Sequence, residues 1–258
     1  MYPILLELGR FRFHSYGVVV LVAILIALWV AGREARRKGL GSEIASDLAV
    51  PVILAGFVGA RLAYVVGWEP DLFWRDPLGV LAVWRGGLAL HGGLLGGFAA
   101  GFWFCRRRRV NPWRMGDAVA PALILAQGIG RLACLLSGDS YGTPSNLPWA
   151  ITFTNPDALA PLGVPLHPTQ LYEFGLDLGL FGLLWALRKR MAVDGQLFLL
   201  YAGGYGVIRL LTETVRGDRV ELAMSLSLLQ AASLALILAA SVALGWRMAA
   251  GRQDARSV

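Results

Sequence analysis

The sequence predicts an all-α membrane protein, a bundle of seven transmembrane helices with a small head segment on the outer side. Hydrophobic residues make up 56% of the 258 positions and charged residues only 16%, which is too apolar for a soluble domain of this length. Seven apolar stretches recur, each near the roughly 20 residues that a helix needs to cross a bilayer. They cover residues 16–32, 47–67, 88–104, 115–136, 171–187, 195–213 and 223–246.

The basic residues predict the orientation of these helices. Fifteen of the 24 lie at alternate ends of the stretches, which puts them on one side of the membrane. They are Arg33, Arg36, Arg37, Lys38, Arg106, Arg107, Arg108, Arg109, Arg114, Arg188, Lys189, Arg190, Arg247, Arg252 and Arg256. That side is cytoplasmic by the positive-inside rule, so the amino terminus is outside and the carboxyl terminus inside. The net charge of +7 therefore reflects topology, and no nucleic-acid partner is expected.

The sequence predicts a single polytopic membrane domain, residues 1–258. No cofactor is expected. The first stretch lacks the flanks of a cleaved signal peptide and is interpreted as a retained helix. Cys105 and Cys134 predict no disulfide framework, and three scattered histidines predict no metal site. The stretch 137–170, rich in Pro, Ser, Thr and Asn, is expected to be the head insertion, with a short strand at 149–153. Trp68, Trp74 and Trp84 are expected to anchor the protein at the headgroup interface.

Charged residues inside the apolar stretches indicate where function lies. An arginine at the centre of a membrane helix costs about 2.5 to 3.5 kcal/mol and needs a partner or a role. Tyr205, Arg209, Glu213 and Arg216 are spaced by four, four and three, which predicts one polar face of a helix. In the alternative interpretation, Glu213 only neutralises the arginines as a contact between helices.

A second arginine lies in a glycine-bracketed segment, G-I-G-R-L-A-C-L-L-S-G-D-S-Y-G, residues 128–142. It contains Arg131 and, eight residues later, Asp139. Because arginines bind phosphate oxygens through two nitrogens, Arg131 and Arg209 predict a pocket for a lipid phosphate. The alternative pairs Arg131 with Asp139 or Asp117.

Histidines open three of the stretches near the outer face. His91 lies among glycines in G-G-L-A-L-H-G-G-L-L-G-G, and we interpret these glycines as space around its ring. A packing role for His91 is the alternative. The motif H-P-T-Q-L-Y-E, residues 167–173, has Pro168 and Thr169 at a helix start, so helix capping is its simplest interpretation.

With these motifs in order, the chain resembles the prolipoprotein diacylglyceryl transferase family nearly end to end. The motifs that carry the resemblance are H-S-Y-G (14–17), G-A-R-L-A-Y (59–64), H-G-G-L-L-G (91–96), the G-R box (130–142), H-P-T-Q-L-Y-E (167–173) and Y-G-V-I-R-L-L-T-E-T-V-R (205–216). The family implies seven helices, a periplasmic amino terminus and head, a cytoplasmic carboxyl terminus, and location in the bacterial inner membrane.

The resemblance also implies a reaction and its residues. The diacylglyceryl group of phosphatidylglycerol moves to the lipobox cysteine thiol of a prolipoprotein signal peptide, forming a thioether and releasing glycerol phosphate. His91, Arg131, Tyr205 and Arg209 are the implied catalytic residues. Substrate binding is assigned to Tyr16, Arg131, Asp139, Gly142, Arg209, Glu213 and Arg216.

The G-R box departs from the common family pattern, G-R-x-G-N-F-x-N-G-E-x-x-G. Here Ala133, Cys134, Ser137 and Asp139 replace a glycine, two asparagines and a glutamate. Asp139 keeps the acid on a shorter side chain, whereas the two amides are absent.

Three other classes of protein compete with the transferase. A transporter for an anionic solute would place its polar groups near the midplane in repeated helices, and the sequence has no internal repeat. An intramembrane protease would need paired acids or a serine–histidine arrangement. A purely structural protein accounts poorly for Arg61, Arg131 and Arg209 within apolar stretches.

Overall fold

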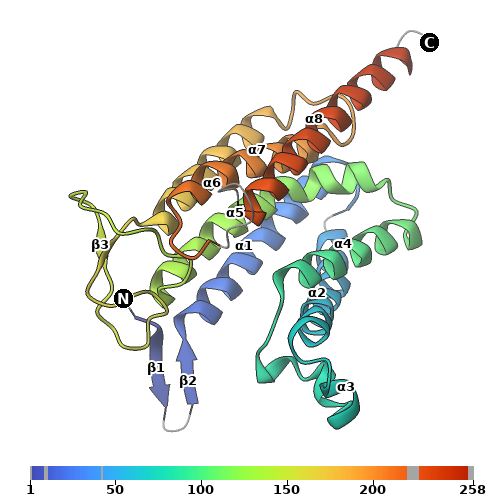
Figure 1. Cartoon of the computed structure of the whole chain (residues 1–258). Helices are drawn as coiled ribbons and strands as arrows, with labels where there is room; N and C mark the ends of the chain where they lie inside the picture. The colour runs from blue at the N-terminus through green and yellow to red at the C-terminus, as the bar shows by residue number, and fades with distance from the viewer. Residues whose placement is uncertain (1, 9–10, 42, 220–226, 255–258) are drawn as a thin grey trace. The chain divides into compact units, whose positions relative to one another are not determined.

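The computed structural model describes residues 2–8, 11–41, 43–219 and 227–254. Each of the seven predicted stretches coincides with a helix (Figure 1). These helices are α1 (Ser15–Arg37), α2 (Ile44–Trp68), α4 (Leu90–Arg107), α5 (Pro112–Ser137), α6 (Thr169–Leu187), α7 (Gln196–Thr212) and α8 (Leu228–Asp254). Residues 223–226 of the last stretch and Arg256, one of the basic residues used to predict orientation, lie outside the described residues.

Several of the helices have the length and the apolar composition of membrane-spanning helices. Among the described residues, α1, α2, α5 and the part of α8 from Leu228 to Ala250 are long and apolar enough to cross a bilayer. Many large apolar side chains on them are exposed, for example Leu25 and Trp29 on α1 and Leu54 on α2. Exposed apolar surface of this extent is suited to lipid rather than to water. The protein is therefore an all-α membrane protein.

An amino-terminal hairpin precedes α1 and was not predicted. Strand β1 (Ile4–Leu8) pairs antiparallel with β2 (Phe11–His14). The hairpin is tied to the start of α1 because both the amide and the hydroxyl of Ser15 donate to the carbonyl oxygen of Pro3, at 2.9 and 3.0 Å. Strand β2, with the sequence Phe-Arg-Phe-His, alternates between apolar and polar residues, so the sequence did contain a signal for this strand.

The chain divides into two compact units, Met1–Ala31 with Gly116–Val258, and Gly32–Met115. In the first unit, α7 packs against both α6 and α8. Ile124, Leu184 and Leu197 form a fully buried apolar core. Asp117 of α5 accepts hydrogen bonds from the amides of Gly195 and Phe198, at 3.0 and 2.9 Å, and so caps the start of α7.

The second unit is built on the close packing of α2 and α4. Gly59 and Gly92 lie at the contact, where a Cβ added to Gly92 would be 2.2 Å from the carbonyl oxygen of Gly59. Small residues at a contact of this kind let the backbones of two membrane helices approach each other closely. The short helix α3 (Leu72–Arg75) and the 3-10 turns η1 (Gly79–Leu81) and η2 (Val83–Arg85) connect the two helices.

Arg61 has a structural role in this second unit. Its side chain is buried, and its guanidinium donates to the carbonyl oxygens of Gly86 and Gly79 at 2.8 and 3.1 Å. These bonds hold the connection between α2 and α4 against α2. Trp68, Trp74 and Trp84 are all exposed there; their place at a headgroup interface stays a prediction.

The segment 137–170 has its own small core within the first unit. Strand β3 (Ile151–Thr152) pairs antiparallel with β4 (Pro165–Leu166). The side chains of Phe153, Ala160 and Leu166 are buried together. The short strand predicted at 149–153 is therefore confirmed as a two-residue strand.

Candidate active site

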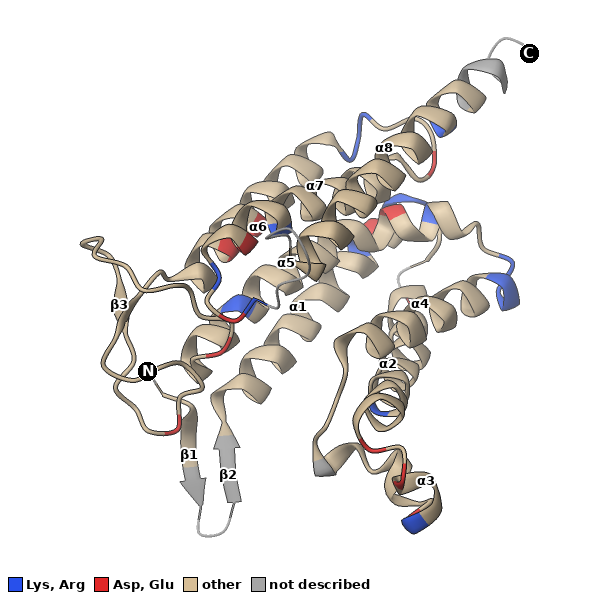
Figure 2. Ribbon diagram, viewed as in Figure 1, with Lys and Arg blue, Asp and Glu red and all other residues tan. Residues whose placement is uncertain are grey.

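Glu173 is the centre of a network of ion pairs near the carboxyl-terminal ends of α5 and α7 and the amino-terminal end of α6. Its Oε1 lies 2.7 Å from Nη1 of Arg209 and 3.3 Å from Nη1 of Arg216, and its Oε2 lies 2.5 Å from Nη2 of Arg131. The carboxylate is buried, with 2% of its side chain exposed. We call Arg131, Arg209 and Arg216 the arginine cluster. In Figure 2 acidic positions of α6 lie beside a basic position of α5.

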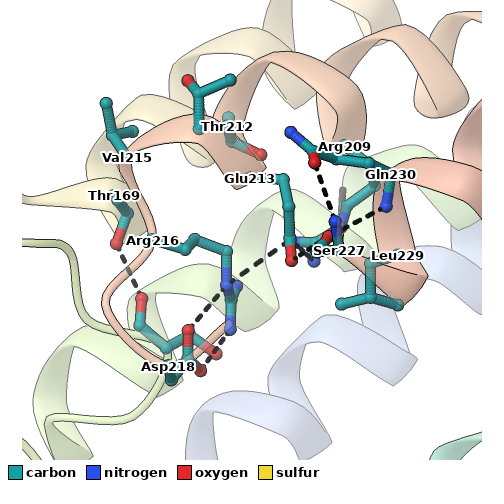
Figure 3. A network of polar contacts seen from close by, with 12 residues as sticks. Thr169, Arg209, Thr212, Glu213, Val215, Arg216, Asp218, Ser227, Leu229 and Gln230 are labelled. Atoms are coloured by element: carbon teal, nitrogen blue, oxygen red, sulfur yellow. Dashed lines mark hydrogen bonds and ion pairs between the residues drawn. The ribbon is translucent and has the colours of Figure 1, made fainter. Parts of the chain in front are cut away.

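Glu213 holds the arginine cluster from a second side (Figure 3). Its Oε2 lies 3.0 Å from Nη2 of Arg209, while its Oε1 accepts a hydrogen bond from the hydroxyl of Ser227 at 2.9 Å. Each terminal nitrogen of Arg209 thus forms an ion pair with a different carboxylate. Glu213 therefore neutralises Arg209, as in the alternative interpretation, but the ion pair is between residues four positions apart and not a contact between helices.

Arg216 reaches the cluster from outside the helix, so the prediction of one continuous helical face is wrong there. Helix α7 ends at Thr212, Glu213 begins the 3-10 turn η3 (Glu213–Val215), and Arg216 has an extended backbone. Its Nε and Nη2 donate to the carboxylate of Asp218 at 2.9 and 2.5 Å. Burial opposes the charge of this guanidinium, but the bonds to Asp218 outweigh that cost, and the pKa of Arg216 is raised above its ordinary value.

Arg131 pairs with Glu173 and not with the partners considered from sequence. Asp139 accepts a hydrogen bond from the amide of Ser140 at 2.7 Å, and Asp117 caps α7 as described above. The side chain of Arg131 is 16% exposed, compared with 10% for Arg209 and 8% for Arg216. Arg131 is therefore the member of the cluster that a ligand reaches most easily.

The end of the G-R box is held by the start of α6. The hydroxyl of Thr169 donates to the carbonyl oxygen of Ser140, and the side-chain amide of Gln170 donates to that of Asp139, both at 2.7 Å. Helix α6 does begin at Thr169, but this hydroxyl makes a tertiary contact and not the predicted cap. Three of the four residues that depart from the family pattern, Ala133, Cys134 and Ser137, lie inside α5. There the hydroxyl of Ser137 donates to the carbonyl oxygen of Ala133 at 3.0 Å.

Gly142 lies between two backbone segments and leaves no room for a side chain. A Cβ there would lie 2.4 Å from the carbonyl oxygen of His167. On its other side Gly142 forms an isolated antiparallel bridge with Arg216, and the amide of Thr143 donates to the carbonyl oxygen of Val215 at 2.9 Å. Gly142 therefore fixes the backbone that carries Arg216 to the cluster.

Two predicted tyrosines belong to the same unit. Tyr16 of α1 is 45% exposed and has Arg131 and Asp139 among its electrostatic neighbours. Tyr205 of α7 is partly buried, interacts electrostatically with Arg131 and Arg209, and stacks on Tyr201 with ring centroids 6.3 Å apart. The structure thus gathers eight of the nine predicted site residues in this unit.

His91 belongs to the other compact unit. It is the second residue of α4, and its side chain is exposed. Two of the neighbouring glycines, Gly92 and Gly96, lie against the backbone of α2. That the glycines give space to the ring of His91 stays a prediction. Packing explains this motif without reference to the histidine.

Sequence reasoning missed Glu173 and Asp177, two acids on α6. Both are 1% exposed and lie one helical turn apart. The signal was present, since both fall within the apolar stretch 171–187. The cost argument that singled out the arginines applies equally to carboxylates there.

The arginine cluster is suited chemically to an anionic ligand. Three guanidiniums converge on one carboxylate, and guanidiniums bind phosphate oxygens through the same kind of charge-assisted hydrogen bond. Figure 3 shows how Arg209 and Arg216 approach Glu213 and Asp218 from α7 and the chain that follows it.

Comparison with known proteins shows the family of this chain. The profile of the prolipoprotein diacylglyceryl transferases matches residues 3–246. Phosphatidylglycerol–prolipoprotein diacylglyceryl transferases from Vibrio cholerae and Bordetella avium are 37% and 35% identical, covering 86% and 83% of this chain and 81% of each relative. The Staphylococcus aureus protein of that name is 34% identical over 92% of this chain and 85% of its own. The chain therefore belongs to the prolipoprotein diacylglyceryl transferase family.

Proposed function

We propose that this protein transfers the diacylglyceryl group of phosphatidylglycerol to the lipobox cysteine thiol of a prolipoprotein. The carbon–oxygen bond to the phosphate breaks, a thioether forms, and glycerol phosphate leaves. The observation that carries the proposal is the convergence of Arg131, Arg209 and Arg216 on Glu173, within the region that the family profile covers.

The arginine cluster is proposed to bind the donor phosphate and stabilise it as a leaving group. Negative charge grows on the phosphate as the carbon–oxygen bond breaks, and fixed guanidinium donors lower the energy of that charge. Arg131 and Arg209 supply this clamp, and Glu213 and Arg216 hold it in shape through their contacts with Arg209 and Glu173. The clamp needs little rearrangement because buried carboxylates already hold its nitrogens in place.

The acceptor thiol needs a base, because a free thiol with a pKa near 8.5 is mostly protonated at neutral pH. We assign this role to His91. Tyr16 and Tyr205 are assigned to orientation of the donor headgroup, from their electrostatic contact with Arg131. Asp139 and Gly142 are assigned to the wall of the donor site, since both belong to the backbone held by α6.

The proposed topology has seven spans in the bacterial inner membrane. The amino terminus and the segment 137–170 lie in the periplasm, and the carboxyl terminus lies in the cytoplasm. Support comes from the placement of the basic residues and from the seven helices. The arginine cluster then faces the periplasmic side, where lipid donors and signal peptides with a lipobox cysteine reach it from the membrane.

Mass spectrometry of a lipobox peptide tests the proposed function. The purified protein is incubated with the peptide in phosphatidylglycerol micelles, beside the Arg209→Ala variant. We expect a diacylglyceryl mass increment on the peptide cysteine that the variant does not produce. Absence of the increment, under conditions in which another family member works, would reject the proposal and favour a transporter of anionic solutes.

A further inference from the structure

Asp177 is a buried carboxyl group whose oxygens accept no hydrogen bond from the part of the chain that the structure describes. It lies in α6, one turn after Glu173, and only 1% of it is exposed. Gly128 of α5 faces it so closely that an added Cβ would lie 3.2 Å from the Cβ of Asp177. The absence of a side chain at Gly128 thus lets α5 cover the carboxyl group.

The charged and titratable neighbours of Asp177 come from the three helices packed around it. They are Arg131 of α5, Glu173 of α6, and Tyr201, Tyr205 and Arg209 of α7. Beyond them, Leu180 and Phe181 follow on α6 and pack against the apolar core. Asp177 therefore lies between the arginine cluster and apolar side chains.

The arginine cluster is already balanced without Asp177. Its three guanidiniums form ion pairs with three carboxylates, those of Glu173, Glu213 and Asp218. An ionised Asp177 would add a fourth negative charge with no hydrogen bond to stabilise it. Burying an unpaired charge costs far more free energy than burying the neutral acid. The geometry therefore favours the neutral form.

We propose that Asp177 is a positioning residue that carries a proton in the resting protein, and that loss of this proton weakens the binding of the donor phosphate. The inference rests on the proposed function, because that phosphate is the anion concerned. With a neutral Asp177, the donor phosphate is the one negative charge added to the balanced cluster. When Asp177 ionises, its proton goes to water, and the new carboxylate repels the phosphate and competes with it for Arg131 and Arg209.

The substitution Asp177→Asn tests the proposal because it keeps the shape of the side chain but cannot ionise. The KM for phosphatidylglycerol micelles, with a lipobox peptide as acceptor, is measured from mildly acidic to mildly alkaline pH. We expect the KM of the unmodified protein to rise about tenfold, which corresponds to about 1.4 kcal/mol, and that of Asp177→Asn to stay constant. Asp157→Asn, an exposed matched control, should follow the unmodified protein.

Two results would overturn the inference. One is an Asp177→Asn variant whose KM changes with pH as in the unmodified protein, and the other is an unmodified protein whose KM does not change. Infrared spectroscopy of the unmodified protein and of Asp177→Asn gives a test that does not depend on activity. A carbonyl band of a protonated carboxylic acid that only the unmodified protein shows, and that disappears as the pH rises, supports the proposal, and the absence of such a difference contradicts it. Failure of the proposed function would instead appear as no transfer at any pH.

Discussion

Glu173 Oε1 lies 2.7 Å from Nη1 of Arg209, although the two residues are 36 positions apart in the chain. The contact joins α6 to α7 at the point where Arg131 also reaches the same carboxylate. Both side chains are almost completely buried, so neither charge is stabilised by water. Removing one partner of such a pair leaves the other charge uncompensated, which makes the contact sensitive to substitution.

We expect Glu173→Gln to lower diacylglyceryl transfer at least tenfold and to reduce stability by about 3 to 5 kcal/mol, the usual effect of breaking a buried ion pair. Glutamine keeps the volume but leaves three guanidiniums without the charge that they share. Transfer to a lipobox peptide and thermal unfolding in detergent measure the two effects. Glu43→Gln, at an exposed position that makes no side-chain cap, is the matched control. Near-normal activity and stability of Glu173→Gln would exclude a central role for this carboxylate.

We expect Arg209→Lys to lose transfer activity by about 10² to 10³-fold, as removal of an electrostatic donor does at other active sites. Lysine keeps the charge, but its single nitrogen cannot bond Glu173 and Glu213 together as the two guanidinium nitrogens do. Initial rates at saturating donor measure the loss. Arg75→Lys, whose side chain is 79% exposed, should behave like the unmodified protein. An active Arg209→Lys variant would show that charge alone is sufficient.

The helices could be predicted because the requirements of a bilayer are simple. An apolar run of the right length must be helical in lipid, since every backbone group needs a partner. The residues at which the helices end were harder to predict. The spacing of Tyr205, Arg209, Glu213 and Arg216 suggested one helical face, but α7 ends at Thr212, and the bridge between Gly142 and Arg216 replaces the last turn. That bridge depends on a segment more than 70 residues earlier in the chain.

The sequence predicted which residues belong to the candidate site better than it predicted which of them contact one another. Arg131 and Arg209 were recognised because buried arginines are costly, and both lie in the network. Their shared partner, Glu173, is the last residue of H-P-T-Q-L-Y-E. That motif was interpreted from its first residues as the start of a helix, so no partner was sought in it. The ion pair depends on how α5, α6 and α7 pack, which no spacing within one helix encodes. The same limit applies to the glycines beside His91, whose contacts lie on α2.

We expect Gly142→Ala to lower both activity and stability. The new Cβ would lie 2.4 Å from the carbonyl oxygen of His167, so one backbone segment must move, at a cost of about 1 to 3 kcal/mol for overpacking. The displacement would carry Arg216 away from Glu173. Thermal unfolding and peptide lipidation measure the two effects. Gly175→Ala on α6, where an added Cβ meets nothing within 4 Å, is the control and should be neutral or slightly stabilising.

We expect Gly92→Ala to destabilise the packing of α2 against α4. Its Cβ would lie 2.2 Å from the carbonyl oxygen of Gly59 and 2.3 Å from the Cβ of Ala63, so the helices must separate. The midpoint of thermal unfolding in detergent should fall. Gly67→Ala adds the same methyl group to α2 where nothing lies within 4 Å, and it should leave the midpoint unchanged or raise it. Equal midpoints for the two variants would contradict the glycine contact.

His91→Gln tests the assignment of the base. Glutamine keeps a polar side chain at the exposed second position of α4 but cannot accept the thiol proton as an imidazole does. We expect kcat to fall by about 10² to 10⁴-fold, the usual contribution of general base catalysis, with little change in the KM for phosphatidylglycerol. His14→Gln, at another exposed histidine, is the control. If His91→Gln kept near-normal turnover while Arg209→Ala abolished it, the histidine would not be the base. Catalysis would then depend on the arginine cluster and on thiol that ionises without help from the protein.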